Sequence, residues 1–592
     1  MSSKKSLTRL RRFFLFAALA IISITTFSPK GAGQMQNPDD RRPVSIDSAP
    51  AAVSENWGSS ALWRRYIWQS LPTESSNGPD PDPVSEAYQR NDWKPIFIDS
   101  QFGLNQGAAL LLARLHTLEN DAIDPRPFRL DELTQNLDKL DQCRSALQAV
   151  DPGIRDTRAE SFFDAQPAAF AAVASANQST APPPMANPEV ILERYRESFL
   201  TASEADIRLT SDFFLFAKEM NPFLEKEESL KALSGEIPLS KFFEELEPET
   251  FNYEALRSSF QKYKKLQARG TLQRVSMPAK PRLGESGNHI RDLQKRLQQE
   301  DFYSGSITGV YDSETQNAVK KFQVAHMLDP DGAIGNQTKE WLNVSFQEKA
   351  DLISQALKAV RQSPSRAYTS FIRINIPQFT LEYYKDGQFQ EAHKIVVGKA
   401  TGKKVKFRGR MVGENQTPTL TSSIQQLILN PRWYVSDRIR LELDTEAKSD
   451  PEWFTRHGYV SMSARYPWGA PRLFQSPGPK NALGRVKFEF PNPYAVYLHD
   501  TPLKHLFARS RRDFSHGCIR VDKAIELAET LLRDDASSYA EKMKPVLEGS
   551  RQLFVKLSKP VPISIEYIPV VAAGNSQIIF AGDIYGIFKE DK

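Results

Sequence analysis

The pattern of apolar and polar positions changes from helical to strand-like along the chain. Apolar residues recur at helical spacing in "GAALLLARLHTLENDAIDP" (residues 107–125), and helical patterns resume at Val190 and run with breaks to about Gln273. From about Tyr368 the pattern alternates, as in Ile372, Ile374 and Ile376 before Pro377. "HKIVVGKA" and "SSIQQLILNP" are similar, and the C-terminal "VPISIEYIPVVAAGNSQIIFAGDIYG" predicts two strands joined at "AAGNS". These patterns predict a multidomain α+β protein whose last part is rich in strands.

A compact unit over residues 281–345 separates the two patterns. Its predicted first helix has one apolar face, and Asp312 is placed to cap the second helix. Gly332 and Gly335 mark turns before a short third helix that begins at Thr338. The apolar positions of the first two helices are Ile290, Leu293, Leu297, Thr315, Ala318, Val319 and Phe322. Nothing in this three-helix unit predicts catalysis, so we expect it to bind a ligand or to pack.

Two features stand out within the strand-rich part. "VDKAIELAETLL" predicts a helix that Asp522 can cap, with a buried stripe of Ala524, Leu527, Ala528 and Leu531. Residues 434–480 form a long segment rich in aromatic and turn residues, and loops of such length in compact domains are often functional. We interpret this segment as a lid-like insertion.

The N-terminus has the composition of a targeting segment. Residues 1–33 hold a basic stretch, an apolar run from Phe13 to Phe27 and then small residues, which is the pattern of a secretory signal. The run would make roughly 22 Å of helix, which is short for a membrane span. We therefore expect a cleaved signal or a membrane anchor, and an exported protein of the periplasm, with the inner membrane reached only through that anchor.

Charge and cysteine content narrow the classes of function. The formal charge is +5, but six basic residues lie before Gln34 in a segment without acidic residues, so the rest is near neutral and no nucleic acid is expected as a partner. The chain has only two cysteines, Cys143 and Cys518, which is unlike a secreted disulfide scaffold. A disulfide between them would remove the reactivity of Cys518.

Rare reactive side chains gather in "YAVYLHDTPLKHLFARSRRDFSHGCIRV" (residues 494–521). Cys518 needs a base or a cation beside it, because a free thiol is mostly protonated at neutral pH. His499, His505 and His516 are close in sequence, and Gly517 permits a backbone geometry that suits an oxyanion site. The spacing alone leaves three interpretations open: a catalytic Cys–His pair, a buried structural cysteine with incidental histidines, and a zinc site.

Longer motifs resemble known families. His499 followed by "SHGCIR" (Ser515 to Arg520) resembles the signature of L,D-transpeptidases of the YkuD type, and "NPRWYV", "NALGRVKFEFPNPYAVYLHDTP" and "DIYG" are similar to the large subfamily of these enzymes. Asp312-x-x-Thr315-x-x-Ala318-Val319-x-x-Phe322-Gln323 with the later "GAIGNQT" resembles a peptidoglycan-binding domain 1 repeat. "NQTPTLTSSI" matches the subfamily's substrate-side strand only loosely, so contacts with the acyl donor there stay open.

The resemblance implies a domain order. The predicted parts are a signal or anchor at 1–33, a linker at 34–58, a helical scaffold domain at 59–275 with a low-complexity insertion near 164–188, a peptidoglycan-binding module at 281–345, and a β-rich L,D-transpeptidase catalytic domain at 366–590 that contains the lid-like insertion of 434–480. The small module is able to bind the wall or only to space the domains.

The resemblance also implies a cysteine-dependent acyl transfer on peptidoglycan stem peptides, without a cofactor or metal. Cys518 would be the nucleophile, His499 the base, and backbone N–H groups near Gly517 the oxyanion site, with His516 a further catalytic candidate for orienting the loop or binding substrate. Arg520, Tyr497 and Ser515 are the candidate substrate-binding residues. A carbapenem is an expected covalent inhibitor.

Two other classes of function stay open at this point. One is a zinc-dependent peptidoglycan hydrolase, for which Asp500 and Asp513 are the nearby acidic residues. The other is a non-catalytic wall-binding scaffold. The acyl acceptor also stays open, because a second stem peptide, a lipoprotein lysine, a free D-amino acid and water all use the same thioester.

Overall fold

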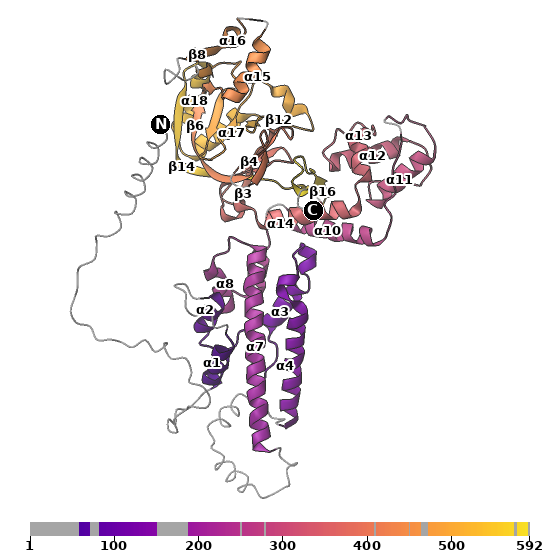
Figure 1. The fold of residues 1–592 in the computed structure, drawn as a ribbon, viewed down its shortest axis with the longest axis vertical. Helices are drawn as coiled ribbons and strands as arrows, with labels where there is room; N and C mark the ends of the chain where they lie inside the picture. Colours follow the sequence, from indigo (N-terminus) through magenta and orange to yellow (C-terminus); the bar gives the residue numbers. More distant parts are fainter. Residues whose placement is uncertain are drawn as a thin grey trace, which may run out of the picture. The chain divides into compact units, whose positions relative to one another are not determined.

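The computed structural model describes residues 59–71, 82–150, 187–248, 252–277, 280–407, 410–448, 450, 452–462, 472–573 and 577–589. The predicted signal or anchor, the predicted linker and all but the last two residues of the predicted low-complexity insertion lie outside these ranges. Among the described residues, no helix is both long and apolar enough to span a bilayer. Helices come first and strands later, which confirms the predicted multidomain α+β class (Figure 1).

Helices make up the first part of the described chain, and α4 and α7 run side by side (Figure 1). Local caps fix where some of them begin: the Asp82 carboxylate accepts from the N–H of Ser85 at the start of α2, and Asn187 caps α7 in the same way, each before a proline. The helices are α1 Ser59–Ser70, α2 Pro83–Arg90, α3 Gln106–Leu115, α4 Leu130–Val150, α7 Pro188–Met220, α8 Lys226–Leu233, α9 Leu239–Glu245 and α10 Tyr253–Ala268, with 3₁₀ turns η3 Leu118–Asp121 and η4 Arg126–Phe128.

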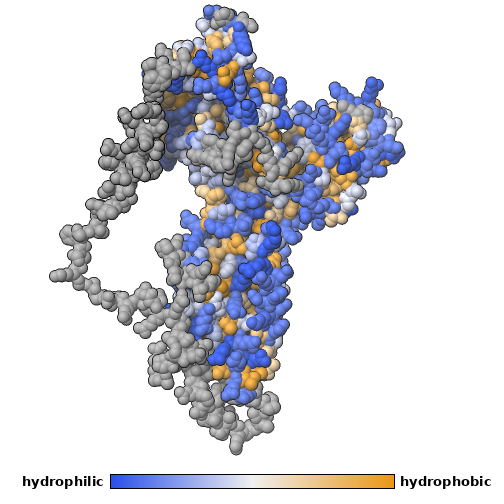
Figure 2. All heavy atoms as spheres, viewed as in Figure 1, coloured by the Kyte–Doolittle hydropathy of each residue, from blue (hydrophilic) through white to orange (hydrophobic). Residues whose placement is uncertain are grey.

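Two apolar cores hold these helices, and hydrophilic residues cover much of their visible surface (Figure 2). One core joins α1, α2, α4 and α7 through aromatic side chains such as Trp63, Tyr88 and Phe199. The second core joins α3 and α7–α10 to residues far along the chain, including Ile353 of α14 (Phe346–Arg361) and Phe580. The helical region is therefore completed by segments that the predicted scaffold domain, which ends at residue 275, did not include.

The predicted three-helix unit is present as α11 Asn288–Gln299, α12 Ser313–Ala325 and α13 Asn336–Asn343. The Asp312 carboxylate accepts from the Thr315 N–H at 2.8 Å, which confirms the predicted cap. The predicted apolar positions on α11 and α12 are all buried in one core of this unit, apart from the polar Thr315, which is buried beside that core.

A buried ionic cluster joins this unit to α14. The Lys349 ammonium on α14 lies 2.8 Å from both carboxylate oxygens of Glu300 and 3.1 Å from Nε2 of His326, and Arg296 also contacts Glu300. The His326 ring stacks between Phe322 at 4.0 Å and Phe580 at 5.2 Å. Burial, together with Lys349, lowers the pKa of His326 well below its usual value, so the imidazole is neutral.

Strands from Phe371 onward build a nine-stranded sheet in the order β12-β3-β13-β11-β10-β6-β14-β1-β2. Because β2 also pairs with β3, the sheet closes on itself, and the long strand β3 pairs with both β13 and β2. The strands of this sheet are β1 Phe371–Asn375, β2 Thr380–Lys385, β3 Gln388–Gly398, β6 Leu420–Leu429, β10 Val486–Glu489, β11 Leu498–His499, β12 Asp513–Ser515, β13 Ile519–Val521 and β14 Leu553–Glu566.

Smaller elements surround this sheet. They are the pairs β4 Lys404–Phe407 with β5 Arg410–Gly413 and β15 Val570–Ala573 with β16 Gln577–Phe580, the sheet β7 Trp433–Tyr434, β9 Arg472–Gln475 and β8 Tyr459–Met462, helices α15 Asp437–Ala447, α16 Trp453–Arg456, α17 Ala524–Asp534 and α18 Tyr539–Glu548, and turns η5 Pro364–Ala367, η6 Lys504–Ala508 and η7 Ile587–Lys589. Along the chain, β14 is the last strand of the large sheet, and the pair β15 and β16 follows it. The segment "VPISIEYIPVVAAGNSQIIF" therefore contains parts of three strands and not two.

Helix α17 buries the predicted stripe of Ala524, Leu527, Ala528 and Leu531 against the sheet. The predicted cap is wrong, because Lys523, with φ +52°, precedes the helix and no side chain caps it. The backbone N–H of Asp522 instead donates to the carbonyl of Lys394 on β3. The helix therefore begins from a strand connection and not from a side-chain cap.

Candidate active site

Polar side chains occupy one face of three adjacent strands, β10, β11 and β13. The register places Lys487 opposite His499 and His499 opposite Arg520, so these three side chains point to the same face. Tyr497 and Cys518 lie two residues before His499 and Arg520 and share that face by alternation. The other face is apolar and buried, with Val486, Phe488, Leu498, Ile519 and Val521 in the core. Because the apolar face must lie in the core, the polar side chains of these strands point to the opposite face.

Cys518 lies in the turn between β12 and β13 and is partly buried. Burial raises the pKa of its thiol, while hydrogen bonds from Tyr497 and the charges of Lys487 and Arg520 act in the opposite direction. Both cysteines are free, and Cys143 is buried on α4, with its sulfur 3.7 Å from Oγ1 of Thr201. No disulfide therefore competes for Cys518.

His499 is buried and fixed in one orientation. Its Nδ1 lies 2.5 Å from the carbonyl oxygen of Asp500, and since a carbonyl only accepts, Nδ1 carries the proton and Nε2 has the lone pair. Burial first, then the charges of Arg520 and Lys487, lowers the pKa of His499 to about 3. The imidazole is therefore neutral at physiological pH and can accept a proton at Nε2.

Hydrogen bonds within the turn before Cys518 involve two of the predicted site residues, Ser515 and Gly517. The Ser515 hydroxyl is buried, donates to the carbonyl of Cys518 at 2.5 Å and accepts from the Gly517 N–H at 3.1 Å. The Ser515 hydroxyl is thus a local brace of the turn, and a contact of Ser515 with substrate stays a prediction. The Gly517 amide, predicted near the oxyanion, is likewise engaged, so Gly517 contributes its φ of +119°, which favours glycine.

A second brace reaches this turn from distant strands. The Thr417 hydroxyl donates to the carbonyl of Gly517 at 2.8 Å and accepts from the N–H of Gly398 at 2.9 Å. The Tyr585 hydroxyl donates to the carbonyl of Gly398 at 2.8 Å and accepts from the N–H of Thr417 at 3.2 Å. Thr417 lies in the loosely matching "NQTPTLTSSI" and Tyr585 in "DIYG", and sequence reasoning gave neither of them this role.

His516 points away from Cys518 toward the insertion. Its Nε2 lies 3.0 Å from Oε2 of Glu442 on α15, and burial lowers its pKa although Glu442 acts to raise it. On the same helix, Arg438 pairs with Glu414 at 3.2 Å and contacts Asn415, which precedes the Thr417 brace. The insertion therefore contacts the nucleophile turn and its support.

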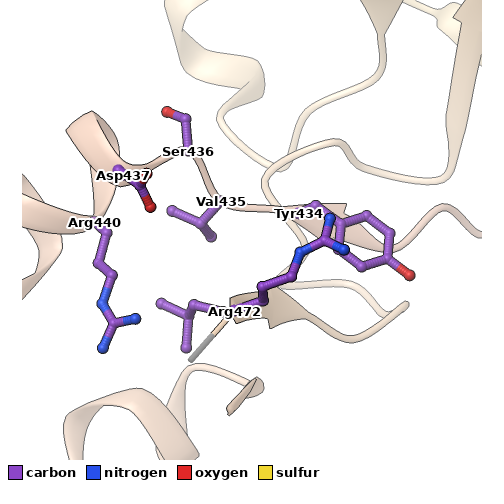
Figure 3. Close-up of a pocket in the computed structure, with 7 residues that line it drawn as sticks. Tyr434, Val435, Ser436, Asp437, Arg440 and Arg472 are labelled. Atoms are coloured by element: carbon purple, nitrogen blue, oxygen red, sulfur yellow. The ribbon is translucent and has the colours of Figure 1, made fainter. Parts of the chain in front are cut away.

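The insertion has structure of its own. It was predicted as a long loop-like segment, but β7, β9 and β8 form a small sheet beside α15 and α16. A pocket of about 400 Å³ lies within it, where the guanidinium groups of Arg440 and Arg472 enter from two different elements (Figure 3). Tyr434, Val435, Ser436, Asp437, Arg440, Arg472 and Leu473 line this pocket, and none of the predicted site residues does.

Residues at the edge of the insertion connect it to the nucleophile. The Trp433 and Cys518 side chains both interact with the Tyr497 phenol. Tyr497, predicted to line the pocket of the enzyme, therefore lies against the nucleophile itself.

Arg520 and Lys487 are the cations on this face. Burial lowers the pKa of Arg520, and its guanidinium forms no hydrogen bond or ion pair within the described ranges. Sequence reasoning missed Lys487, whose ammonium lies 4.2 Å from the centroid of the Tyr497 ring. The sequence signal that could have found Lys487 is its polar position in the alternating segment "RVKFEF".

The remaining histidine of the sequence cluster lies elsewhere. His505 is exposed on η6, whereas His499 is buried and His516 faces Glu442. Across the part of the chain that the structure describes, no group of three or more His, Cys, Asp or Glu side chains is arranged to hold a metal ion.

Two family models match the chain. Residues 369–559 match YkuD, described as "L,D-transpeptidase catalytic domain", and residues 286–342 match PG_binding_1, described as "Putative peptidoglycan binding domain". The catalytic-domain match contains every residue of the polar strand face.

Two curated proteins are similar to parts of the chain. A Haemophilus influenzae protein named "Putative L,D-transpeptidase" is 29% identical over 249 residues, which is 39% of this chain and 47% of that protein. The "Spore cortex-lytic enzyme" of Halalkalibacterium halodurans is 32% identical over 79 residues, which is 13% of this chain and 24% of that protein. The chain thus spans less than half the length of each of these relatives.

Two solved structures are also similar. An L,D-transpeptidase from Xylanimonas cellulosilytica is 18% identical and covers 49% of this chain and 98% of its own, with a TM-score of 0.17. An L,D-transpeptidase from Mycobacterium smegmatis is 15% identical and covers 33% of this chain and 58% of its own, also with a TM-score of 0.17. The assignment rests on the family models: residues 369–559 belong to the YkuD family of L,D-transpeptidase catalytic domains, and residues 286–342 to the PG_binding_1 family.

Proposed function

We propose that this protein is a cysteine-dependent L,D-transpeptidase that joins peptidoglycan stem peptides by 3→3 cross-links. The observation that carries the proposal is the shared strand face of Cys518, His499 and Arg520, where a thiol lies among a neutral imidazole with a lone pair on Nε2 and a cation without a protein partner in the described ranges. A nucleophile, a base and a binding site for a carboxylate are the parts that this acyl transfer needs.

In the first half-reaction, the Cys518 sulfur attacks the carbonyl of the third residue of a tetrapeptide stem. The thiol proton passes to Nε2 of His499 and then to the nitrogen of the terminal D-Ala, so that a C–S bond forms and the C–N bond to D-Ala breaks. Because Gly517 already donates to Ser515, the N–H of Cys518 is the amide of this turn assigned to the oxyanion.

In the second half-reaction, an amine of a neighbouring stem attacks the thioester. The new C–N bond is the 3→3 cross-link, the C–S bond breaks, and the proton released by the amine returns through His499 to the Cys518 sulfur. Arg520 binds a carboxylate of the stem, which orients the scissile carbonyl.

The rest of the chain suits work on the wall. The peptidoglycan-binding domain at 286–342 supplies a second contact with the same polymer, and the N-terminal segment exports the protein to the periplasm, with or without anchoring it to the inner membrane.

The test is muropeptide turnover by the purified protein. Cys518→Ser is expected to abolish cross-linked product while Cys143→Ser retains it, and a chelator is expected to change nothing. Incubation with a carbapenem should add the mass of the drug to the peptide that contains Cys518. Loss of activity with the chelator would support the zinc hydrolase instead, and a folded wild-type protein without turnover or adduct would support the non-catalytic scaffold.

A further inference from the structure

The strand face that carries the nucleophile also carries a lysine to which no role has been given so far. Lys487 on β10 stands opposite His499 in the register, and its side chain is only 16% exposed. A lysine this deeply buried in a sheet needs a reason, because burying an ammonium is unfavourable unless it is paired.

Lys487 is paired with one carboxylate, and its second contact leads toward the nucleophile. The Lys487 ammonium lies 2.7 Å from Oε1 of Glu489 and 4.2 Å from the centroid of the Tyr497 ring, which is within the range of a cation–π contact. The Tyr497 phenol lies beside the Cys518 thiol and interacts with it. Lysine, aromatic ring and sulfur therefore form a row that runs from β10 past the start of β11 to the residue before β13.

We propose that Lys487 is a positioning residue that holds the Tyr497 ring against Cys518 and stabilises the thiolate. The cation attracts the face of the ring, so the phenol stays where its hydroxyl can donate to sulfur, and the positive charge favours the thiolate form directly. The inference rests on the proposed function only in naming Cys518 as the nucleophile.

The other charged groups around Cys518 determine how much Lys487 can stabilise the thiolate. Arg520 on β13 is the second cation, and Glu489 on β10 offsets part of the Lys487 charge. His499 on β11 and Tyr497, which directly precedes β11, are neutral. His516, in the turn, is paired with Glu442 of the insertion. Two variants with opposite signs follow from this arrangement: Lys487→Met removes a cation, and Glu489→Gln removes the anion that offsets it.

The experiment measures the rate at which iodoacetamide alkylates Cys518 in the full-length protein as a function of pH. In Lys487→Met the midpoint is expected to move to higher pH, with about a tenfold lower rate at neutral pH for a shift of one pKa unit and the same limiting rate at high pH. Glu489→Gln should move the midpoint the other way, and Lys487→Arg should stay close to wild type. Lys394→Met, an exposed lysine on β3, is the matched control.

Several outcomes would overturn the proposal. An unchanged pH midpoint in Lys487→Met, or a shift in the same direction for Glu489→Gln, would remove the electrostatic role. An unchanged midpoint with weaker turnover of muropeptide only at low substrate concentration would assign Lys487 to substrate binding. Alkylation does not need a substrate, so a wild-type protein without transpeptidase activity would contradict the proposed function while leaving this test intact.

Discussion

At the scale of single residues, the proposed base and the nucleophile are both uncharged in the resting site. Burial lowers the pKa of His499 to about 3 and raises that of Cys518, so a thiolate–imidazolium pair is not formed in advance. The proton must therefore move while the sulfur attacks, which makes the fixed orientation of the imidazole more important than its basicity.

A pH profile tests this view of His499. A group with a lowered pKa becomes charged only as the pH falls toward that value, so the acid limb of acylation should lie well below pH 6 and not near 6.5. His499→Ala should slow acylation by about 10²-fold or more, while His516→Ala and the exposed His505→Ala should cost less. An acid limb near 6.5 that disappears in His499→Ala would contradict the lowered pKa.

Arg520 gives a second test at this scale. Its guanidinium has no ion-pair partner in the described residues, so a carboxylate of a carbapenem should bind there while the drug acylates Cys518. Arg520→Ala should slow acylation by an amount equal to about 1.5–3 kcal/mol, and Arg520→Lys by less. Arg533→Ala, an exposed position on α17, is the control, and equal rates in wild type and Arg520→Ala would remove the binding role.

The sequence predicted the residues with rare chemistry better than the residues that support them. Cys518 and His499 could be named because thiol and imidazole have few other uses, and the alternation around "YAVYLH" placed Tyr497 on the same strand face as His499. The partners of Ser515 and Gly517 within the turn could not be specified from the sequence, since a hydrogen bond within a turn depends on backbone angles that the sequence does not give. Thr417 and Tyr585 were missed because their partners lie 100 or more residues away in the chain.

At the scale of elements, helix α15 is the part of the insertion that contacts the nucleophile turn. Glu442 bonds to His516 and Arg438 contacts the segment before Thr417, so one helix contacts both the turn and the segment that leads to its Thr417 brace. The insertion was predicted to be a lid from its length alone, whereas its small sheet arises from pairings between residues 433–434, 459–462 and 472–475 that no local pattern reveals.

Breaking the α15 contact should open access to Cys518 with little cost in stability. Glu442 is half exposed, and pairs of this kind contribute about 1 kcal/mol or less. Glu442→Ala is therefore expected to speed alkylation of Cys518 by a bulky maleimide by about two- to fivefold, with almost no change in melting temperature. Glu446→Ala, one turn further along α15, is the control; a large loss of stability, or no change in alkylation, would mean that the contact does not hold a lid.

At the scale of the whole molecule, the small three-helix module is held by a buried ionic cluster and not only by its linkers. Glu300 and His326 belong to the module, Lys349 to α14 and Phe580 to β16. The sequence predicted this module well because its helix faces and cap are local. The cluster could not be predicted, because it forms between segments that are distant in sequence. Residues 346–365, which contain Lys349, also fall between the predicted domains.

The cluster predicts that two substitutions within it will lower the free energy of unfolding by different amounts. Glu300→Gln leaves two buried cations, Arg296 and Lys349, without a counter-charge and should destabilise the protein by about 3–5 kcal/mol, whereas Lys349→Met should cost less, because Glu300 and Arg296 then still balance each other. Denaturant unfolding followed by fluorescence measures both. Lys358→Met, exposed on the same helix as Lys349, should be neutral, and a Lys349→Met variant at least as unstable as Glu300→Gln would contradict the ionic account.

The core that joins α3 and α7–α10 includes residues from the end of the chain, and this determines when it can be completed during folding. Ile568, Val570 and Phe580 pack in the same core as Leu111 and Phe213, although more than 350 residues separate the two groups. Helices made early in synthesis therefore keep part of their apolar surface exposed until the last strands of the chain emerge. A ribosome that stalls near residue 560, or a protease that trims the C-terminus, would leave a helical domain that has every one of its own residues and still lacks a closed interior.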